Sequence, residues 1–366
     1  MLKDNRSTTP RLKREIHSGA LTLLTLLAIV SPAAANQASQ PQVPPPVQIN
    51  DLSVHDPCIL ADTNSRTYYI YAGYDLKRDG GRLKSSNGRA GVKAFLSKDL
   101  LKWTGPQLVF EIPAGFWGDA DSSPWAPEVH AYNGKYYLFT TFNAWKEEMD
   151  RRPGRPFINK RASQILVADS PLGPFKPFSN QPHTPPDEMT LDATFWVEDG
   201  QPWLIYCHEW VQLGNGLVKA IRLKPDLSAT EGDPITLLNA GGFAWTRKEI
   251  GYRAGRFPGA VTDGPYFWRT SRGVLAMIWS SWTPEHQYAL AFAYSPSGKL
   301  AGPWQHDAGP TLWDDRGHGM IFRDFDGRLL LCLHRYFHQP KTRVQLWELE
   351  DVGDRLKLGK QILGAP

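Results

Sequence analysis

Short apolar segments separated by tight polar turns recur along this chain in five similar units. In each unit a first apolar segment is followed by a turn and a second one, as in 191–196, Asp199-Gly200 and 203–206. The first segments begin at positions 56, 126, 192, 263 and 318, with separations of 70, 66, 71 and 55 residues. Third apolar segments follow at 92–96, 164–168, 217–221, 288–292 and 343–347. Strand-rich units at this spacing predict an all-β fold, a five-bladed β-propeller.

Three acidic residues and one histidine stand at the start of first segments. In a propeller the first strand of each blade lines the central channel, so residues at its start converge on the axis. We therefore expect Asp56, Asp192, Asp263 and His318 to meet in one pocket. Carboxylates that are brought together raise one another's pKa, which is typical of a functional site. The alternative is that each acid caps its own strand and bonds to a neighbouring blade.

The N-terminal 35 residues have the pattern of a secretory signal peptide. Five basic residues precede an apolar run at 20–30, and a small-residue cleavage site follows at 33–35. The run is too short to span a bilayer, and no later segment is long and apolar enough for a membrane helix. A Pro-rich stretch predicts an extended spacer at 36–50, so the catalytic domain is expected at 51–366. We expect an exported protein, periplasmic or secreted, with no membrane contact after removal of the signal.

Charge and cysteine content exclude some classes of partner. Without the five basic and two acidic residues of the first 35, the 41 basic and 37 acidic residues become 36 and 35. A chain with nearly equal numbers of basic and acidic residues is not expected to have the basic face of a nucleic-acid-binding protein. Cys58, Cys207 and Cys332 lie in apolar strand patterns, which predicts buried small side chains rather than a disulfide framework. We expect a monomer.

Several short motifs occur in one order along the chain. They are His55-Asp56-Pro57, Ser97-Lys98-Asp99 through Trp103, Trp125-Ala126-Pro127-Glu128, Ser170-Pro171-Leu172-Gly173-Pro174, Leu191-Asp192-Ala193-Thr194, Asp263-Gly264-Pro265, Ser295-Pro296-Ser297-Gly298 with Gly302-Pro303-Trp304, and Gly317-His318-Gly319. Together they resemble glycoside hydrolase family 43, the five-bladed propeller glycosidases, from about residue 51 to the end.

The resemblance implies an inverting glycosidase with a general base, a general acid and a third carboxylate that modulates the acid. An inverting pair stands about 6.5 to 9.5 Å apart, which leaves room for the attacking water. By the resemblance Asp56 is the base and Asp192 the modulator. Asp263 stands where the family usually has the Glu that acts as the acid, so its arm is one methylene shorter. Glu209, beside Trp210, is a competing candidate for the acid, because an aromatic setting raises a carboxyl pKa.

The resemblance also implies an axial histidine near a calcium ion. His318 is either a metal ligand, with water completing an oxygen-rich shell, or a histidine bonded to the axial acids without metal. Trp125, Trp117 and Phe195 are candidates for stacking on sugar rings. Glu128 either contacts substrate or forms a structural ion pair, and His318 is a further substrate-binding candidate.

The expected partner is an oligo- or polysaccharide. By resemblance an α-L-arabinofuranosidase comes first, and a β-D-xylosidase or β-D-galactofuranosidase on the same scaffold is the alternative. Sucrose and fructan hydrolases share the propeller, but their Arg-Asp-Pro and Glu-Cys motifs are absent here. A non-catalytic glycan-binding propeller is the other class, and it predicts loss of an axial acid. Loops at 143–163 and 239–259 are the candidates for blocking one end of a cleft.

Overall fold

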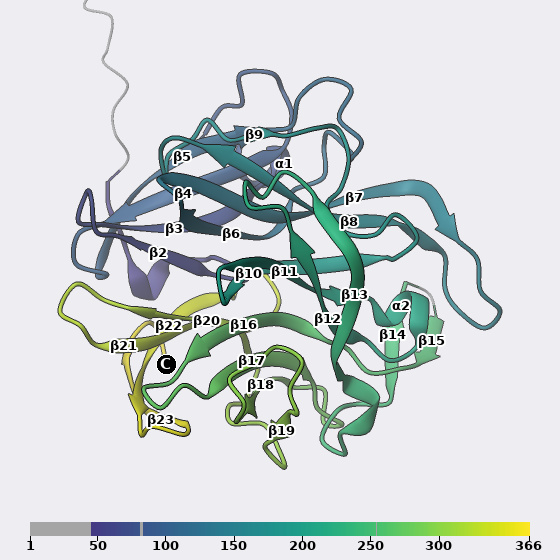
Figure 1. Ribbon diagram of the computed structural model, residues 1–366. Helices are drawn as coiled ribbons and strands as arrows, with labels where there is room; N and C mark the ends of the chain where they lie inside the picture. Colours follow the sequence, from purple (N-terminus) through teal and green to yellow (C-terminus); the bar gives the residue numbers. More distant parts are fainter. Residues whose placement is uncertain (1–44, 81–82, 254) are drawn as a thin grey trace, which may run out of the picture. The chain divides into compact units, whose positions relative to one another are not determined.

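The computed structural model describes residues 45–80, 83–253 and 255–366, so the expected signal peptide lies outside the described residues. Five antiparallel sheets follow one another along the chain (Figure 1). They are β2 (Cys58–Asp62), β3 (Thr67–Tyr74), β4 (Gly91–Ser97) and β5 (Lys102–Glu111); β6 (Trp125–Tyr132), β7 (Lys135–Asp150), β8 (Ile158–Ala168) and β9 (Lys176–Pro177); β10 (Thr190–Glu198), β11 (Gln201–His208), β12 (Leu217–Leu223) and β13 (Thr230–Asn239); β16 (Asp263–Arg269), β17 (Leu275–Trp282), β18 (Tyr288–Ser295) and β19 (Gln305–His306); and β20 (Arg316–Arg323), β21 (Leu329–Arg335), β22 (Arg343–Asp351) and β23 (Leu356–Leu363).

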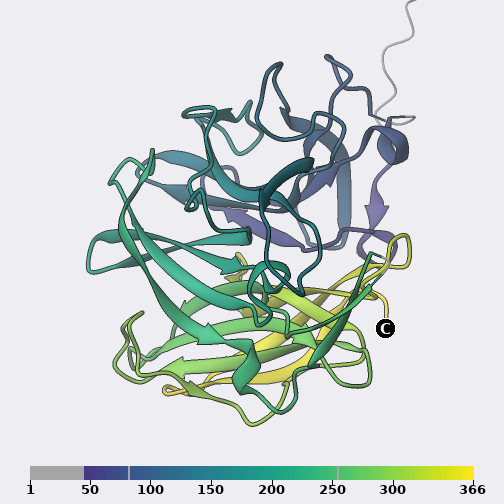
Figure 2. The same cartoon turned by 90° about the vertical axis from the view of Figure 1, so that its right-hand side faces the viewer.

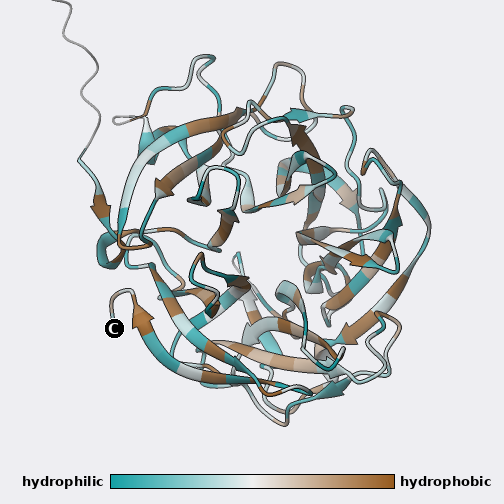
Figure 3. Ribbon diagram, turned by 60° about the vertical axis from the view of Figure 1, so that its left-hand side comes forward, coloured by the Kyte–Doolittle hydropathy of each residue, from teal (hydrophilic) through white to brown (hydrophobic). Residues whose placement is uncertain are grey.

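These sheets are the five blades of the propeller that the sequence predicts, and the all-β prediction is confirmed. In Figure 3 they form a ring, with apolar residues concentrated on the strands and polar residues on the loops. Outside the sheets the structure describes short helices at α1 (Leu76–Asp79), α2 (Trp210–Leu213), η1 (Ile49–Asp51) and η2 (Ala240–Gly242), and a hairpin of β14 (Glu249–Tyr252) and β15 (Gly255–Pro258). Within the described ranges no helix is long and apolar enough to cross a membrane.

Tight turns join the first two strands of blades 2 and 3. Asn133 and Gly134 have φ angles of 47° and 76°, and Asp199 and Gly200 have 52° and 79°. Two consecutive positive φ angles are typical of the turn whose twist matches that of an antiparallel pair, and Asn-Gly and Asp-Gly adopt it most readily. The turn residues therefore fix the register of the innermost strands.

The core is distributed between the blades. Five buried apolar clusters each combine residues of two neighbouring sheets: blades 1 and 2, 2 and 3, 3 and 4, 4 and 5, and 5 and 1. Cys58 and Cys332 both belong to the cluster between blades 5 and 1, and Cys207 belongs to the one between blades 3 and 4. All three are free thiols in buried positions, as the sequence predicts.

The expected boundary between spacer and domain is too late in the sequence. Strand β1 (Val47–Gln48) pairs with β5 at the outer edge of blade 1, and Ile49 is 3% exposed in the cluster between blades 5 and 1. Val344 N–H donates to the Leu52 carbonyl at 3.4 Å and so links the N-terminal segment to blade 5. Residues 47–50 therefore belong to the folded unit, because burial of Ile49 and pairing of β1 help to close the ring.

Candidate functional site

One residue near the start of each innermost strand has a left-handed backbone. The φ angles are 51° at Asp56, 41° at Ala126, 54° at Asp192, 50° at Gly264 and 47° at His318. In blades 2 to 5 the pairing with the second strand shifts at this place, which is a β-bulge. Bulges re-aim side chains next to functional sites. The repeated conformation defines the axial position of each blade.

The axial position of blade 4 is Gly264, and the prediction that Asp263 shares the position of Asp56 and Asp192 is wrong by one residue. Asp263 pairs with Ser280 directly before the bulge, as Leu191 pairs with Cys207 in blade 3. A bulge adds a residue that sequence spacing alone does not reveal. A Cβ on Gly264 would lie 2.8 Å from the His318 ring, so the ring fills the space of the missing side chain.

Hydrogen bonds from the preceding blade hold three axial residues in this backbone. A non-glycine residue in the left-handed region is strained by about 1 to 3 kcal/mol, and the surrounding structure must hold it there. The backbone N–H groups donate to side chains on the second strand of the preceding blade: Asp56 to His334 Nδ1 at 3.2 Å, Asp192 to Thr141 Oγ1 at 3.0 Å, and His318 to Ser280 Oγ at 2.8 Å. Contacts between blades thus set the direction of the axial side chains.

A cavity of about 430 Å³ opens at the axial positions and is lined by residues of all five blades. Asp56, Asp192 and Asp263 line it together, and so does His318. The structure thus brings together the four residues that the sequence predicts to converge. Trp125, from the start of β6, forms part of the wall.

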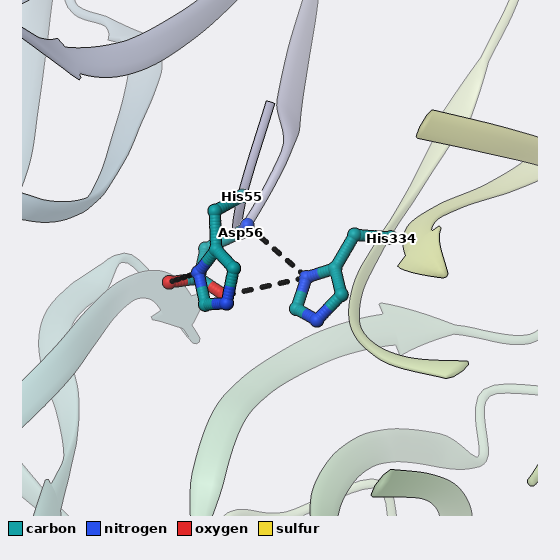
Figure 4. Close-up of side chains that lie close together, drawn as sticks. All are labelled: His55, Asp56 and His334. Carbon is teal, nitrogen blue, oxygen red and sulfur yellow. Dashed lines mark hydrogen bonds and ion pairs between the residues drawn. The ribbon is translucent and has the colours of Figure 1, made fainter. Parts of the chain in front are cut away.

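Asp56 lies among histidine rings. His318 Nδ1 is 3.0 Å from Asp56 Oδ1, and His55 Nδ1 is 2.8 Å from Asp56 Oδ2. Burial raises the pKa of Asp56, but the charges and hydrogen bonds of His318 and His55 outweigh it and hold this pKa well below its ordinary value. Asp56 is therefore ionised at neutral pH. Figure 4 shows the contacts that His55 and His334 make with Asp56.

Asp263 has the opposite setting. Burial and the nearby charge of Asp192 raise the pKa of Asp263 well above its ordinary value, against the opposing charge of His318. Tyr288 Oη donates to Asp263 Oδ2 at 3.1 Å. Asp263 therefore keeps its proton to a higher pH than Asp56.

Asp192 is connected to both of these carboxyl groups through its contacts, and its pKa is influenced by the charge of Asp56. Burial raises the pKa of Asp192 to about 7, with His318 lowering it and Asp56 raising it. Asp192 Oδ2 accepts the backbone N–H of Gly264 at 3.0 Å and lies 3.7 Å from His318 Nδ1. Asp192 thus contacts the residue next to Asp263 and the histidine that bonds Asp56.

Glu209, the competing candidate for the acid, is not among the residues that line the cavity. Its side chain is 6% exposed, and its Oε2 lies 2.8 Å from Arg161 Nη1. Burial raises the pKa of Glu209, while Arg161 and Arg155 lower it. The Arg161 guanidinium lies 4.4 Å from the ring centre of Trp125. Glu209 therefore anchors the cation behind Trp125 instead of facing the cavity.

Of the three aromatic candidates, Trp125 alone lines the cavity. Trp117 packs on Phe116 and Phe142 and donates its indole N–H to Gln164 Oε1 at 2.6 Å. Phe195 packs against the cluster between blades 2 and 3. Neither ring lines this cavity, because its apolar faces are used in packing between blades.

Glu128 does not line the cavity either. In a regular strand Glu128 would point to the same side as Ala126, two residues earlier, but the bulge between Trp125 and Glu128 breaks that alternation. Glu128 is 6% exposed, and its Oε2 lies 2.9 Å from His130 Nε2. Its contact in the structure is thus a hydrogen bond with His130.

His318 is bonded to the axial carboxylates through one ring nitrogen. Its Nδ1 lies 3.0 Å from Asp56 Oδ1 and 3.7 Å from Asp192 Oδ2. Burial lowers the pKa of His318, but the surrounding carboxylates, led by Asp56, raise it to about 10. Calcium takes six to eight oxygen ligands, so an ion at this place would need the axial carboxylates and water in addition to the ring, and the calcium ion stays a prediction.

In the described part of the chain one group of residues has the spacing of metal ligands. It consists of His55, Asp56 and His334, whose possible ligand atoms lie within 4.8 Å of one another. Two of its nitrogens are already used in the protein. His55 Nδ1 bonds Asp56 Oδ2, and His334 Nδ1 accepts the Asp56 N–H. Figure 4 draws these contacts. The cluster positions Asp56 and does not fit a calcium ion, since it offers one carboxylate.

Sequence reasoning missed His334, Tyr288 and Arg161. His334 is fully buried, with its ring centre 4.4 Å from that of His55 and 5.5 Å from that of Tyr288. Each of the three lies in or at the end of an apolar strand pattern, and no motif marks it. The available signal was a polar residue within a strand that the apolar pattern predicts to be buried. Such a buried polar group needs a hydrogen-bond partner.

The loops that were expected to block one end of the cleft do not border the cavity. None of the described residues at 143–163, 239–253 and 255–259 lines the cavity. The β7–β8 hairpin extends to the right in Figure 1, the side that faces the viewer in Figure 2. Arg78 of α1 and Gln339 of the β21–β22 loop line the cavity, and Arg78 Nη1 donates to Gln339 Oε1. Blades 1 and 5 are thus linked at the rim.

The chain matches proteins that cleave glycans. Residues 46–346 match the family model of glycosyl hydrolases family 43. The crystal structure of an endo-arabinase from Bacteroides thetaiotaomicron VPI-5482 is similar, with 34% identity, a TM-score of 0.70, and coverage of 84% of this chain and 98% of that one. The structure of an α-L-arabinofuranosidase from Lactobacillus brevis has 20% identity and a TM-score of 0.63, over 87% and 98% of the chains, which is a likeness of fold.

Among curated proteins, the extracellular endo-α-(1→5)-L-arabinanase 1 of Bacillus subtilis (strain 168) is 24% identical over 206 residues. The match spans 54% of this chain and 54% of the relative, so it covers about half of the relative's length. The resemblance seen in the sequence motifs is confirmed by the family match and by the propeller. The chain is a glycosidase that hydrolyses glycosidic bonds, and it belongs to glycosyl hydrolases family 43.

Proposed function

We propose that this protein hydrolyses α-L-arabinofuranosyl bonds of arabinan-type glycans with inversion at the anomeric carbon. The observation that carries the proposal is the pair Asp56 and Asp263, which line one cavity with opposite shifts in pKa. An inverting enzyme needs one carboxylate to take a proton from water and one carboxylic acid to give a proton to the leaving oxygen. Two carboxyl groups whose surroundings push their pKa values apart supply these roles.

In the proposed reaction Asp56 is the general base. The ionised carboxylate accepts a proton from water as the water oxygen forms its bond to the anomeric carbon. His318 and His55 bond to the two carboxylate oxygens at 3.0 and 2.8 Å and hold Asp56 in its charged form. A charged carboxylate of low pKa is a modest base, and positioning of the water supplies much of the remaining effect.

Asp263 is the general acid in this scheme. It donates its proton to the glycosidic oxygen as the bond from that oxygen to the anomeric carbon breaks, and the electron pair leaves with the oxygen. Residues at the same place before the bulge in other blades, Trp125 and Leu191, also line the cavity. This register thus faces the cavity in three blades, which supports Asp263 as a residue that reaches substrate.

Asp192 is the proposed modulator. Its charge contributes to the raised pKa of Asp263, and its Oδ2 accepts the N–H of Gly264 at 3.0 Å, beside the acid in the chain. Trp125 is the proposed stacking surface for a sugar ring. Arg161 lies 4.4 Å from the centre of its ring, and Glu209 and Asn143 hold that guanidinium through bonds of 2.8 and 2.7 Å.

The arabinan assignment is supported by the endo-arabinase that is 34% identical over 98% of its length. The arabinan assignment keeps the bond type of the expected α-L-arabinofuranosidase. It moves the favoured site of cleavage from the end of the glycan to its interior. Export of the protein is part of the proposal, supported by the N-terminal pattern and by the extracellular relative.

The test is a panel of substrates with the mature protein: linear arabinan, xylan, galactan and the aryl α-L-arabinofuranoside, β-D-xyloside and β-D-galactofuranoside. We expect cleavage of arabinan above all others. Proton NMR in the first minutes of turnover is expected to show the inverted anomer before mutarotation. Preference for a xyloside or galactofuranoside would overturn the substrate, and initial retention would overturn the mechanism.

A further inference from the structure

A second cavity of about 410 Å³ lies beside the catalytic one and is lined by Gln287, Thr311, Leu312, Trp313, Asp314 and Arg316. Trp313 is 57% exposed, the largest value among the exposed large apolar side chains of the described residues. Tryptophan is usually well buried, because its ring contributes a large apolar area. An indole ring left in solvent on the wall of a cavity is therefore a candidate contact for a ligand.

Trp313 is held on a fixed support. Its loop, between β19 and β20, pairs with β18: Leu290 N–H donates to the Leu312 carbonyl at 2.8 Å, and Leu312 N–H donates to the Leu290 carbonyl at 3.1 Å. On the other side of Trp313, Asp314 and Asp315 have φ angles of 63° and 62°. Two consecutive strained residues persist only where surrounding contacts hold them, and such strain concentrates at functional sites.

The two charged residues that line this cavity pair with each other. Asp314 Oδ2 lies 2.9 Å from Arg316 Nη1, and it also lies 2.6 Å from Arg335 Nη2, which is not among the lining residues. Neither lining charge is therefore unpaired. In the described part of the chain no hydrogen bond engages the side-chain amide of Gln287 or the hydroxyl of Thr311. A flat apolar ring beside free neutral polar groups suits a neutral polyhydroxylated ligand.

Neighbouring residues line the two cavities. Gln287 lines the second cavity, and Tyr288, the next residue in the chain, lines the catalytic one together with Phe337. The Asp315 carboxylate accepts the N–H of Tyr288 at 3.4 Å and the N–H of Phe337 at 3.1 Å. The loop that carries Trp313 is thus bonded to the wall of the catalytic cavity.

We infer that the Trp313 cavity is a glycan-binding subsite that holds a distant part of the polysaccharide whose bond is cleaved at Asp56 and Asp263. Trp313 stacks on a sugar ring, and Gln287 and Thr311 bond to hydroxyl groups. The identity of the polymer as arabinan rests on the proposed function; the site itself rests on the geometry of blades 4 and 5. The other occupant of an exposed aromatic surface, a second copy of the chain, is an outcome of the test.

The test compares Trp313→Ala with Phe178→Ala, an aromatic side chain 37% exposed next to β9 of blade 2. Affinity electrophoresis in gels that contain arabinan, xylan or galactan measures binding, with both changes made in the inactive Asp56→Asn protein. We expect Trp313→Ala to weaken binding of arabinan at least about fivefold, the size of a significant contact residue. Phe178→Ala should leave binding unchanged.

Kinetics on the active protein separate this subsite from a structural role. Trp313→Ala should raise KM for arabinan while leaving kcat for arabinan and kcat/KM for the aryl arabinofuranoside unchanged. Equal losses on both substrates, unchanged retardation in the gels, or conversion of a dimer into a monomer in sedimentation would overturn the subsite. A third outcome is that xylan or galactan, but not arabinan, retards the protein in the gels and that Trp313→Ala abolishes this retardation. That outcome would support the subsite and overturn the arabinan assignment.

Discussion

Blade 1 and blade 4 present the same residue type to the same cavity, with pKa values shifted in opposite directions. Asp56 lies between His55 and His318, which lower its pKa, whereas Asp263 lies near Asp192 and receives a hydrogen bond from Tyr288. Both carboxyl groups are buried, and burial by itself raises both pKa values. The difference comes from the neighbours. In this propeller the division between base and acid is therefore set by what the adjoining blades contribute.

The comparison predicts its largest effect at Asp56. Asp56→Asn should reduce turnover at least about 100-fold, because an amide cannot accept the proton of water. The fold should be unchanged, as judged by circular dichroism and thermal unfolding. Retention of more than about a tenth of the wild-type rate on arabinan would exclude Asp56 as the base.

The second prediction separates Asp263 from Glu209. Asp263→Ala should lose far more rate on arabinan than on an aryl arabinofuranoside with a nitrophenyl leaving group, because that group departs without protonation. The basic limb of the pH profile should also disappear, since activity is lost as pH rises through the raised pKa of the acid.

Glu209→Ala is the matched control for this prediction. It should lower activity on both substrates alike and reduce stability by about 3 to 5 kcal/mol, since it leaves Arg161 buried without its partner. If Glu209→Ala instead shows selective retention of nitrophenyl substrates and Asp263→Ala does not, Glu209 is the proton donor and the assignment of Asp263 is wrong.

Much of this arrangement follows from the sequence. The five-unit pattern and its turns predict the blades, and the polar residues at the starts of innermost strands predict the convergence of Asp56, Asp192, Asp263 and His318. The register of blade 4 does not follow, because a bulge makes Gly264 the axial residue. Hydropathy pattern does not reveal bulges, and the same limitation led to the wrong placement of Glu128.

Aromatic residues were harder to assign than acids. Trp117 and Phe195 have the composition of sugar-binding residues, but ring packing between blades uses both. Trp125 and Trp313 differ from them only in what the neighbouring strands leave uncovered. The hydrogen-bond partner of a polar group is equally hard to predict from sequence. His334 bonds to Asp56 although the two residues lie 278 positions apart in the chain.

The smallest predicted effect concerns the support of the base. His334→Phe removes the acceptor of the Asp56 N–H and leaves that group unpaired at a cost of about 1 to 3 kcal/mol. We expect a lower kcat with little change in KM, because Asp56 loses its fixed direction. His334→Asn keeps an acceptor oxygen near the position of Nδ1 and should restore part of kcat. Equal kcat in the two variants would show that the hydrogen bond has no role in positioning.

The protonation states of Asp56 and Asp263 can be measured directly. In protein labelled with ¹³C at the aspartate carboxyl groups, NMR titration of wild type, Asp56→Asn and Asp263→Asn assigns each signal by its loss. We predict that the Asp56 signal is ionised at neutral pH and remains so below about pH 4, while the Asp263 signal is still protonated at neutral pH. A protonated Asp56 with an ionised Asp263 at neutral pH, or two carboxyl groups that titrate together near pH 4, would contradict the account.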